Sequence, residues 1–336
     1  MVMALGSHPR CAVDVAGMRL VNPTQASVDS RALMTDPHRC GFVALVGRPN
    51  VGKSTLLNAL LGEKLAAVSP RPQTTRNRIP GIVTLPGAQI VFVDTPGLHE
   101  GRGALNKYMN EVAREAYGGA DVILMLAEAG ATADGRVSIS RAEQEILKNL
   151  EKTGRPVFLG LNKIDRMSKP LLLPILEAWG KQHDFKALVP ISALNGDGVE
   201  RLRDVLATAL PEGPPLHDAE ALTDLPERFI ASEFIRERLF HALDREVPYA
   251  VAVSITTWTE RVTDGLVQIA ATIHVERESH KGIVIGKGGQ RLKQIGIESR
   301  QAIEALLATQ IHLELFVRVE PRWTETVDGL RKLGYQ

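Results

Sequence analysis

The sequence predicts two domains of different classes, a doubly wound α/β domain followed by a smaller α+β domain. From Phe42 to about Leu210, short apolar runs alternate with segments of helical periodicity, which is the pattern of a parallel sheet with crossover helices. After a proline-rich break at Pro211–Pro215, the pattern changes to strict alternation of apolar and polar residues, which is typical of strands with one buried face. A chain of 336 residues is long enough to bury two such cores.

The first domain contains five apolar runs of strand length with segments of helix length between them. The expected strands are Phe42–Val46, Ile90–Val93, Val122–Ala127, Val157–Leu161 and Leu188–Ile191. The expected helices are Lys53–Leu61, Leu105–Tyr117, Arg141–Lys152, Leu171–Trp179 and Val199–Leu210. Ligands of doubly wound sheets bind at the carboxyl ends of the strands, so a binding site is expected in the loops that follow these strands.

The second domain is expected to begin with an amphipathic helix, which carries Ile230, Phe234, Leu239 and Leu243. Alternating strands are expected at 249–255, 267–275 and 311–319. Between the last two strands lie a helix at Lys281–Ile285, a glycine turn at Gly286–Gly289 and a further helix that carries Leu292, Ile295, Ile303 and Leu306. A short helix is expected near Trp323–Leu333.

These patterns set the expected domain boundaries. Residues 1–39 show no sustained periodicity and are expected to form a disordered extension, because Asp14, Asp29 and Asp36 carry the wrong charge for a transit peptide. Met34 is a candidate translation start. The first domain is expected at 40–211, a linker at 212–225 and the second domain at 226–336.

Composition argues against a protein with a strong global charge, a disulfide framework or a membrane-spanning segment. A net charge of +1 gives no global electrostatic bias toward nucleic acid or membrane, so any such partner must meet a local patch. Cys11 and Cys40 are too few for a disulfide framework, which fits a reducing cytoplasm. The most apolar stretch, Val122–Ala127, is far too short to span a bilayer.

The loop after the first expected strand has the G-x-x-x-x-G-K-[ST] form of a phosphate-binding loop. Such a loop aims backbone N–H groups at the phosphates of a nucleotide and opens a helix whose N-terminus favours anions. Lys53 is expected to neutralise charge on the β- and γ-phosphates, and the Ser54 hydroxyl to coordinate Mg²⁺. The loop residues are Gly47, Arg48, Pro49, Asn50, Val51, Gly52, Lys53 and Ser54.

Later strand ends carry three further elements of a nucleotide site. Asp94-Thr95-Pro96-Gly97 follows the second strand, where Asp94 can hold the magnesium through water and the Gly97 N–H can meet a γ-phosphate. Asn162-Lys163-Ile164-Asp165 follows the fourth strand, and the Asp165 carboxylate can accept hydrogen bonds from N1–H and the exocyclic amine of guanine, a donor pair that adenine lacks. Ser192-Ala193, after the last strand, can offer backbone N–H to guanine O6. The predicted ligand is therefore GTP or GDP with Mg²⁺.

Together these four elements, in this order, resemble the GTP-binding domain of the translation-factor-related GTPases. The resemblance implies that Thr74-Thr75-Arg76 is part of switch I, with Thr75 as a ligand of magnesium and the γ-phosphate. Lys53, Asn50, Thr75 and Gly97 would be the catalytic residues. Leu98 occupies a position where many such GTPases carry a water-orienting glutamine, and because leucine cannot form a side-chain hydrogen bond we expect slow intrinsic hydrolysis. Asn50 matches an asparagine that helps to coordinate K⁺ in one branch of these GTPases.

The glycine turn of the second domain indicates contact with nucleic acid. Glycines at positions 286 and 289 would let a nucleic-acid backbone approach without a Cβ in the way. The stretch from Arg277 to Arg300 contains six Lys or Arg residues and two acidic residues, so positive charge is concentrated at the turn. With its order of elements, this region looks like a KH domain of type II, which ends on an edge strand. The candidate RNA-binding residues are Lys281, Gly286, Lys287, Gly288, Gly289, Arg291 and Lys293.

From Cys40 onward the chain resembles the Era family of bacterial GTPases. Two segments match that family closely, Leu65–Arg76 and His280–Gly289. The resemblance implies a GTP-hydrolysing switch that binds the 3′ end region of 16S rRNA and assists 30S ribosomal subunit assembly and rRNA maturation. It also implies a monomer in the cytoplasm that can associate peripherally with the inner membrane.

Two other functions stay open at this stage. One is an RNA-binding module whose nucleotide domain is only structural, although the presence of Lys53, Ser54, Asp94 and Asp165 argues against it. The other is a GTPase that helps to modify tRNA or works at the membrane, with an incidental glycine turn. Replacement of Lys287 and Gly288 by Asp would separate that function from binding to small-subunit RNA.

Overall fold

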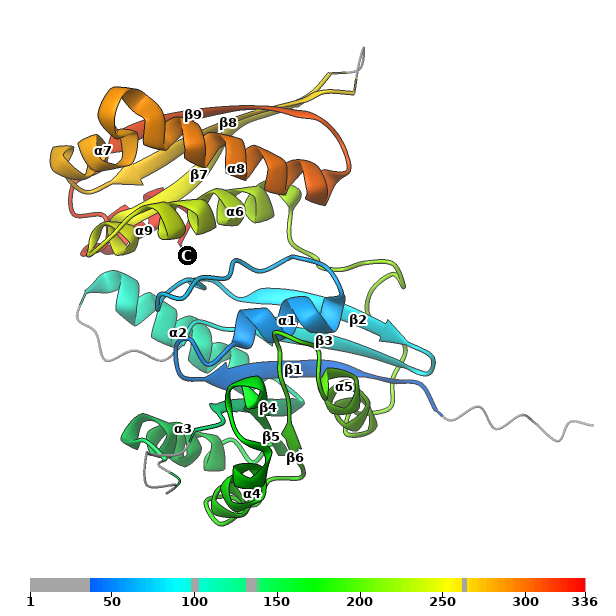
Figure 1. Cartoon of the computed structure of the whole chain (residues 1–336). Coiled ribbons are helices and arrows are strands. Elements are labelled where there is room, and N and C mark those ends of the chain that lie inside the picture. Colours follow the sequence, from blue (N-terminus) through cyan, green and yellow to red (C-terminus); the bar gives the residue numbers. More distant parts are fainter. Residues whose placement is uncertain (1–36, 98–102, 131–136, 138, 262–264, 336) are drawn as a thin grey trace, which may run out of the picture. The chain divides into compact units, whose positions relative to one another are not determined.

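In the first domain, helices cover both faces of a six-stranded sheet (Figure 1). The computed structural model describes residues 37–97, 103–130, 137, 139–261 and 265–335. The elements of this domain are β1 (Arg39–Gly47), α1 (Lys53–Leu61), β2 (Ile79–Leu85), β3 (Ala88–Asp94), α2 (Ala104–Gly119), β4 (Val122–Glu128), α3 (Arg141–Glu151), β5 (Val157–Asn162), α4 (Leu172–Gly180), β6 (Leu188–Pro190) and α5 (Val199–Thr208). The five predicted strands and five predicted helices are all confirmed, with end shifts of a few residues.

The strand order is β2-β3-β1-β4-β5-β6, and every neighbouring pair from β3 to β6 is parallel. Alternate residues of each buried strand face opposite layers. In β1, Val43 and Leu45 pack with α1 and α5, whereas Ala44 and Val46 pack with α2, α3 and α4. The strands are mostly apolar because both faces of the sheet are covered.

The expectation of a wholly parallel sheet is wrong at one edge. β2 is an additional strand that the apolar pattern did not identify, and it pairs antiparallel with β3 through a turn at Gly87, whose φ is +82°. The β-branched residues Ile79, Ile82 and Val83 before Pro86-Gly87 were the available signal for a hairpin. The strand places the preceding segment, which contains Thr75, beside the end of β3.

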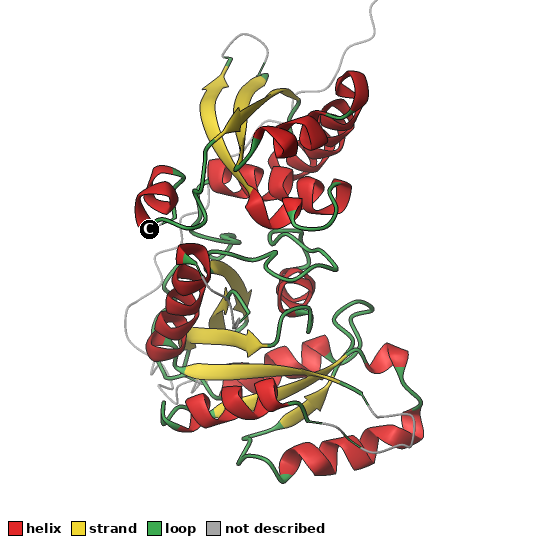
Figure 2. Ribbon diagram, turned by 90° about the vertical axis from the view of Figure 1, so that its left-hand side faces the viewer, coloured by secondary structure: helices red, strands yellow, loops and turns green. Residues whose placement is uncertain are grey.

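In the second domain, the three longer helices pack on one face of a three-stranded sheet (Figure 2). Its elements are α6 (Glu227–Ala242), β7 (Val251–Glu260), β8 (Val267–Val275), α7 (Glu278–Ile285), α8 (Gln290–Leu307), β9 (Ile311–Val319) and α9 (Val327–Lys332). β8 lies in the centre, antiparallel to β7 and parallel to β9. The predicted order of elements is confirmed, and β9 is an edge strand as expected.

Two predicted boundaries in this domain are wrong. Tyr249 lies in a 3₁₀ turn, Val247–Ala250, and not in a strand, because Pro248 favours the start of a helical turn and lacks the N–H that a strand needs. Trp323 lies outside the last helix, which begins only after Thr326. The Trp323 ring is fully buried, and its indole N–H donates to Ala250 O at 3.1 Å.

The segment 212–225, predicted to be a linker, follows an irregular path that is hydrogen-bonded to the first sheet. The buried side chain of Gln89 on β3 accepts from the backbone N–H of Leu216 (2.7 Å) and His217 (2.9 Å). Ile82 N donates to Leu222 O at 2.8 Å. Among the described helices, none is both long enough and apolar enough to cross a bilayer.

Candidate nucleotide site and nucleic-acid interface

The phosphate loop joins the end of β1 to the start of α1, and two of its backbone positions accept only glycine. A Cβ at Gly47 would lie 2.6 Å from Leu126 O, and one at Gly52 would lie 2.3 Å from Asn162 Nδ2. Both residues also have positive φ, +152° and +104°. Lys53 Nζ spans the loop and donates to Gly47 O and Arg48 O, each at 3.1 Å.

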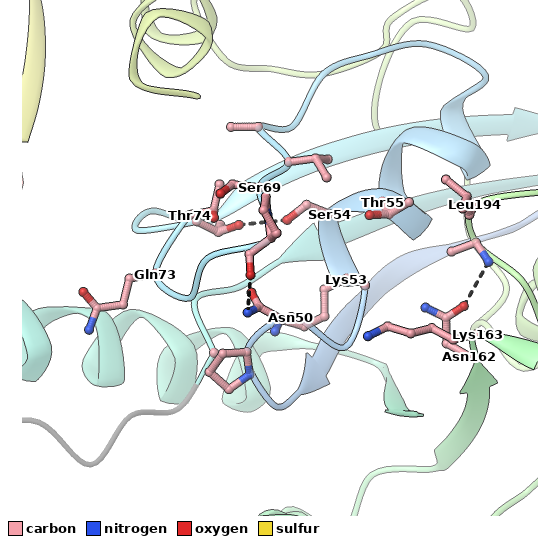
Figure 3. A pocket seen from close by; sticks show the side chains of 18 of the residues that line it. Asn50, Lys53, Ser54, Thr55, Ser69, Gln73, Thr74, Asn162, Lys163 and Leu194 are labelled. Atoms are coloured by element: carbon pink, nitrogen blue, oxygen red, sulfur yellow. Dashed lines mark hydrogen bonds between the residues drawn. The ribbon is translucent and has the colours of Figure 1, made fainter. Parts of the chain in front are cut away.

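A cavity of about 320 Å³ opens over this loop and gathers residues from distant parts of the sequence (Figure 3). The predicted site residues that line it are Pro49, Asn50, Gly52, Lys53, Ser54, Thr75, Thr95, Gly97, Asn162, Lys163, Asp165 and Ala193. The other predicted residues, Gly47, Arg48, Val51, Asp94, Pro96, Ile164 and Ser192, lie in the same loops without lining the cavity. Leu98 lies outside the described residues.

Several residues that line the cavity were not assigned from the sequence, among them Ala67, Val68, Ser69 and Pro70. These four belong to the segment Leu65–Arg76, hereafter the switch segment. Their only signal was the similarity of that segment to the Era family, since such small residues in a loop have no chemistry that points to a ligand. Asn50 Nδ2 donates to Pro70 O at 2.8 Å and so connects the phosphate loop to the switch segment.

Three oxygen-bearing side chains meet at one edge of the cavity. Ser54 Oγ donates to Asp94 Oδ2 at 2.6 Å, Thr75 Oγ1 donates to the same oxygen at 3.1 Å, and the two hydroxyls lie 2.9 Å apart. The second carboxylate oxygen, Asp94 Oδ1, is buried without a hydrogen-bond partner among the described residues. A hard cation is suited to this set, because hydroxyl and carboxylate oxygens are its preferred ligands and its charge would offset the buried carboxylate.

Burial perturbs the two charged groups at this edge in opposite directions. Burial raises the pKa of Asp94, while Lys53 and the hydrogen bonds from Ser54 and Thr75 act to lower it. Burial also lowers the pKa of Lys53, and the charge of Asp94 acts against that shift. The charged form of each group is thus stabilised by the opposite charge of the other.

The opposite end of the cavity is built by Asn162, which connects three loops. Its Nδ2 donates to Val51 O at 2.8 Å, and its Oδ1 accepts from Ala193 N at 2.9 Å. Asp165 accepts a hydrogen bond from Ser192 Oγ at 2.6 Å, and Lys163 pairs with Glu128 at 3.0 Å. The carboxylate of Asp165 is therefore held in orientation by Ser192 and lines the cavity.

The glycine turn of the second domain lies between α7 and α8, as predicted, with Lys287, Arg291 and Lys293 exposed and Lys281 half-buried. Both outer glycines of the turn were expected to leave room for a nucleic-acid backbone, and only Gly289 does so. A Cβ at Gly286 would lie 2.7 Å from Arg291 Cβ, so this glycine is required by the fold, whereas Gly289 faces open space. A groove of about 420 Å³ beside the turn is lined by Gly289, Leu292, Lys293, Gly296, Ile297, Arg300, Leu313 and Leu315.

Two family models match the chain, one in each domain. The model described as 50S ribosome-binding GTPase matches residues 42–163, and the KH domain model matches residues 246–324. The GTPase Era of Geotalea uraniireducens is 52% identical over 298 residues, which cover 89% of this chain and 98% of that protein. The chain belongs to the Era family of GTPases. The GTPase Era of Geobacter metallireducens is similar to the same degree, 52% identical over 300 residues.

Solved structures of Era proteins share the architecture of this Era-family chain. A variant of Aquifex aeolicus Era bound to GDP and AlF₄⁻ superposes with a TM-score of 0.83 at 39% identity, over 88% of this chain and 99% of that one. An Era complex with MgGDPNP and nucleotides 1506–1542 of 16S ribosomal RNA gives the same TM-score and identity, over 89% of this chain and 99% of that one.

Proposed function

We propose that this Era-family GTPase is a GTP-dependent switch that binds the 3′ end region of 16S rRNA and assists 30S ribosomal subunit assembly and rRNA maturation. The observation that carries the proposal is a direct connection between the nucleotide cavity and the second domain. Thr75, in the nucleotide cavity, is flanked by Thr74 and Arg76, and both of these residues are hydrogen-bonded to the second domain. A nucleotide that moves Thr75 must therefore act on those bonds.

In this proposal the nucleotide is GTP or GDP with Mg²⁺. Ser54 and Thr75 would hold the metal, and Asp94 would act on it directly or through water, since these three side chains meet at one point and leave one buried carboxylate oxygen unpaired. When bound, the metal supplies charge that offsets the charge on the transferring phosphate. Lys53 would bind the phosphates, and Asp165, oriented by Ser192, would read guanine.

The RNA site would be the exposed face of the glycine turn and the neighbouring groove. Lys287, Arg291 and Lys293 present positive charge to solvent, and Lys281 adds to it from α7. Gly288 and Gly289 have no atom within 4 Å of an added Cβ, so a nucleic-acid backbone has room to approach. An Era complex at 39% identity contains an rRNA fragment from this region of 16S rRNA, which supports the choice of partner.

Two finer features belong to the same proposal. K⁺ would bind near Asn50, whose side chain also fixes Pro70 of the switch segment, and turnover in potassium salts should then exceed turnover in sodium salts. The protein would act as a monomer in the cytoplasm with peripheral contact to the inner membrane. Flotation with anionic vesicles in GTP and in GDP tests the membrane part separately.

The central test measures the affinity of the full chain for a synthetic RNA with the sequence of the 16S 3′ end. We expect tighter binding with a non-hydrolysable GTP analogue than with GDP, because coupling between two sites is reciprocal. Replacement of both Lys287 and Gly288 by Asp should abolish RNA binding and leave GTP binding intact. Equal RNA affinity in the two nucleotide states would contradict the switch, and unchanged binding by the double variant would favour a tRNA-directed or membrane-directed GTPase.

A further inference from the structure

The switch segment is attached to the second domain through Val68, Arg71, Thr74 and Arg76, and the last two of these residues flank Thr75. Lys64 and Val68 are bound by one carboxylate, Glu237 on α6, which accepts from Lys64 Nζ at 2.5 Å and from Val68 N at 3.0 Å. Arg236, also on α6, donates to Thr74 O. Arg76 reaches across to Val251 O at 2.7 Å and Tyr249 O at 3.0 Å.

Of these contacts, the one from Arg236 acts closest to the nucleotide cavity. Its acceptor, the carbonyl oxygen of Thr74, belongs to the peptide bond that joins Thr74 to Thr75. A peptide bond is planar, so a fixed Thr74 carbonyl also fixes the orientation of the Thr75 N–H and the position of the Thr75 Cα. The Thr75 hydroxyl is then held toward Ser54 and Asp94 from a helix of the other domain.

Arg236 is itself held in place by Glu233, one turn earlier on α6. Arg236 Nε donates to Glu233 Oε1 at 2.8 Å, and Arg236 Nη2 donates to the other carboxylate oxygen. Arg236 is 1% exposed and Glu233 is 5% exposed. The guanidinium also lies 5.4 Å from the ring centre of Phe240. A buried, bidentate pair of this kind has one geometry, whereas an exposed arginine would sample many.

We propose that Arg236, oriented by Glu233, is a positioning residue for GTP hydrolysis that acts through Thr75. The second domain would thus contribute to the catalytic arrangement of the first. The inference rests on the proposed role of Thr75 as magnesium and γ-phosphate ligand. It adds a specific route by which a change in the second domain, such as RNA binding, alters the rate of hydrolysis.

The test compares Arg236→Gln and the conservative Arg236→Lys in the full chain. Displacement of a reacting group by about 1 Å costs on the order of a hundredfold in rate, so Arg236→Gln should lower kcat by about ten- to a hundredfold. GDP affinity should change less than about twofold in the same variant, because Lys53 and Asp165 are untouched and the contact acts on Thr75 alone. Arg236→Lys, which keeps the charge and one donor, should recover part of kcat.

A matched control comes from a second contact between the same segment and the same domain. Arg71 Nη2 donates to Asp244 Oδ1 at 2.8 Å, but this exposed pair lies away from the peptide bond before Thr75. Asp244→Asn should leave kcat and GDP affinity unchanged. If Arg236→Gln does not fold, which circular dichroism will show, Glu233→Gln replaces it because it keeps the arginine and loosens only its orientation.

A double-mutant cycle with Thr75→Ala tests whether Arg236 acts through Thr75. If it does, the double variant should be no slower than Thr75→Ala alone, because interacting residues are not additive. Additive losses would overturn the inference, and so would a parallel fall of kcat and GDP affinity or a kcat equal to that of Asp244→Asn. These outcomes leave the proposed function standing, since that function fails only if the unmodified chain lacks coupled GTP and RNA binding.

Discussion

At the scale of single residues, the proposed function makes selection of the base depend on Asp165. Its carboxylate lines the cavity and is oriented by the hydroxyl of Ser192 at 2.6 Å. Two hydrogen bonds from guanine to a carboxylate are charge-assisted, and each contributes about 1.5–3 kcal/mol. The neighbouring Asn162 has a different task, because both ends of its amide bind other loops of the protein.

Asp165→Asn should therefore weaken GTP binding by more than about tenfold, because the amide opposes one of guanine's two donors. Xanthine carries a carbonyl in place of the exocyclic amine, so the variant should bind xanthosine triphosphate better than the unmodified chain does. Titration with fluorescent analogues of both nucleotides measures the two affinities. Unchanged preference for guanine would show that Asp165 does not read the base.

Gly286 and Gly289 differ in their environments although both have positive φ, +73° and +77°. Gly286→Ala should destabilise the protein by about 1–3 kcal/mol more than Gly289→Ala, because only the Cβ at position 286 meets another atom, Arg291 Cβ at 2.7 Å. The backbone acts in the same direction, because Gly286 has ψ 177°, in a region essentially open to glycine alone, whereas Gly289 has ψ 4°, in the left-handed region that alanine adopts at smaller cost. Urea unfolding of the two variants makes the comparison, and equal midpoints would contradict the clash.

His274 on β8 should make stability depend on pH. Burial lowers the pKa of His274, and the charges of Arg318 and Lys332 add to that effect while Glu320 opposes it. The unfolded chain then binds more protons than the folded one, so the free energy of unfolding should fall as the pH drops below about 6.5. In His274→Gln this slope should be shallower while the contact to Ser254 is retained. Urea unfolding between pH 7 and pH 5 gives both slopes, and identical slopes would exclude this residue.

At the scale of elements, the irregular segment 212–225 is hydrogen-bonded to β2 and β3 at the edge of the first sheet. The segment is attached to the sheet by Gln89 on β3, which is fully buried. Its amide accepts from two backbone N–H groups and donates to His217 O at 2.9 Å. A buried side chain with this many partners acts as a fixed point for an otherwise irregular chain.

Gln89→Leu should release this segment, because it leaves the N–H groups of Leu216 and His217 without their acceptor. The expected loss is about 1–3 kcal/mol of unfolding free energy, together with faster hydrogen exchange at these two amides. Thr84→Val is the control, since it removes only the hydroxyl that accepts from Gln89 Nε2 at 3.1 Å. Exchange rates at 216 and 217 that match the control would refute the role of Gln89.

At the scale of the whole molecule, the buried guanidinium of Arg76 joins the two domains. It is 0% exposed, it donates to backbone carbonyls that include Pro248 O at 3.3 Å, and it lies between the rings of Phe240 and Trp323 at 5.6 and 5.7 Å from their centres. The same residue follows Thr75 directly. The nucleotide cavity and the second domain are therefore connected within three residues of sequence.

Arg76→Met keeps the length and apolar contacts of the side chain but removes every donor. We expect a loss of about 2–4 kcal/mol, since several carbonyls lose charge-assisted hydrogen bonds. The two domains should also unfold less cooperatively, so that tryptophan fluorescence and circular dichroism give different midpoints. Coincident midpoints would show that the domains are joined mainly by other contacts.

Most of the fold, and the residues that gather around the nucleotide cavity, could be predicted without the structure. Apolar runs and helical periodicity located ten elements of the first domain, because local pattern and burial agree in a covered parallel sheet. Motifs such as Gly47–Ser54 and Asp94–Gly97 were readable because their residue types are dictated by phosphate and metal chemistry. The order of elements around Gly286–Gly289 was likewise readable as a KH domain, which the family match confirmed.

Features that depend on contacts between residues far apart in the sequence could not be predicted. The antiparallel β2 was missed because Pro80 and Gly81 interrupt its apolar residues. Gln89, Arg236 and Glu237 look like ordinary polar residues in a strand or an amphipathic helix. Their importance comes from partners more than 100 positions away, at Leu216, Thr74 and Val68. Local sequence encodes periodicity and motif chemistry, whereas burial of a charge and the identity of its partner are set by the packing of the complete chain.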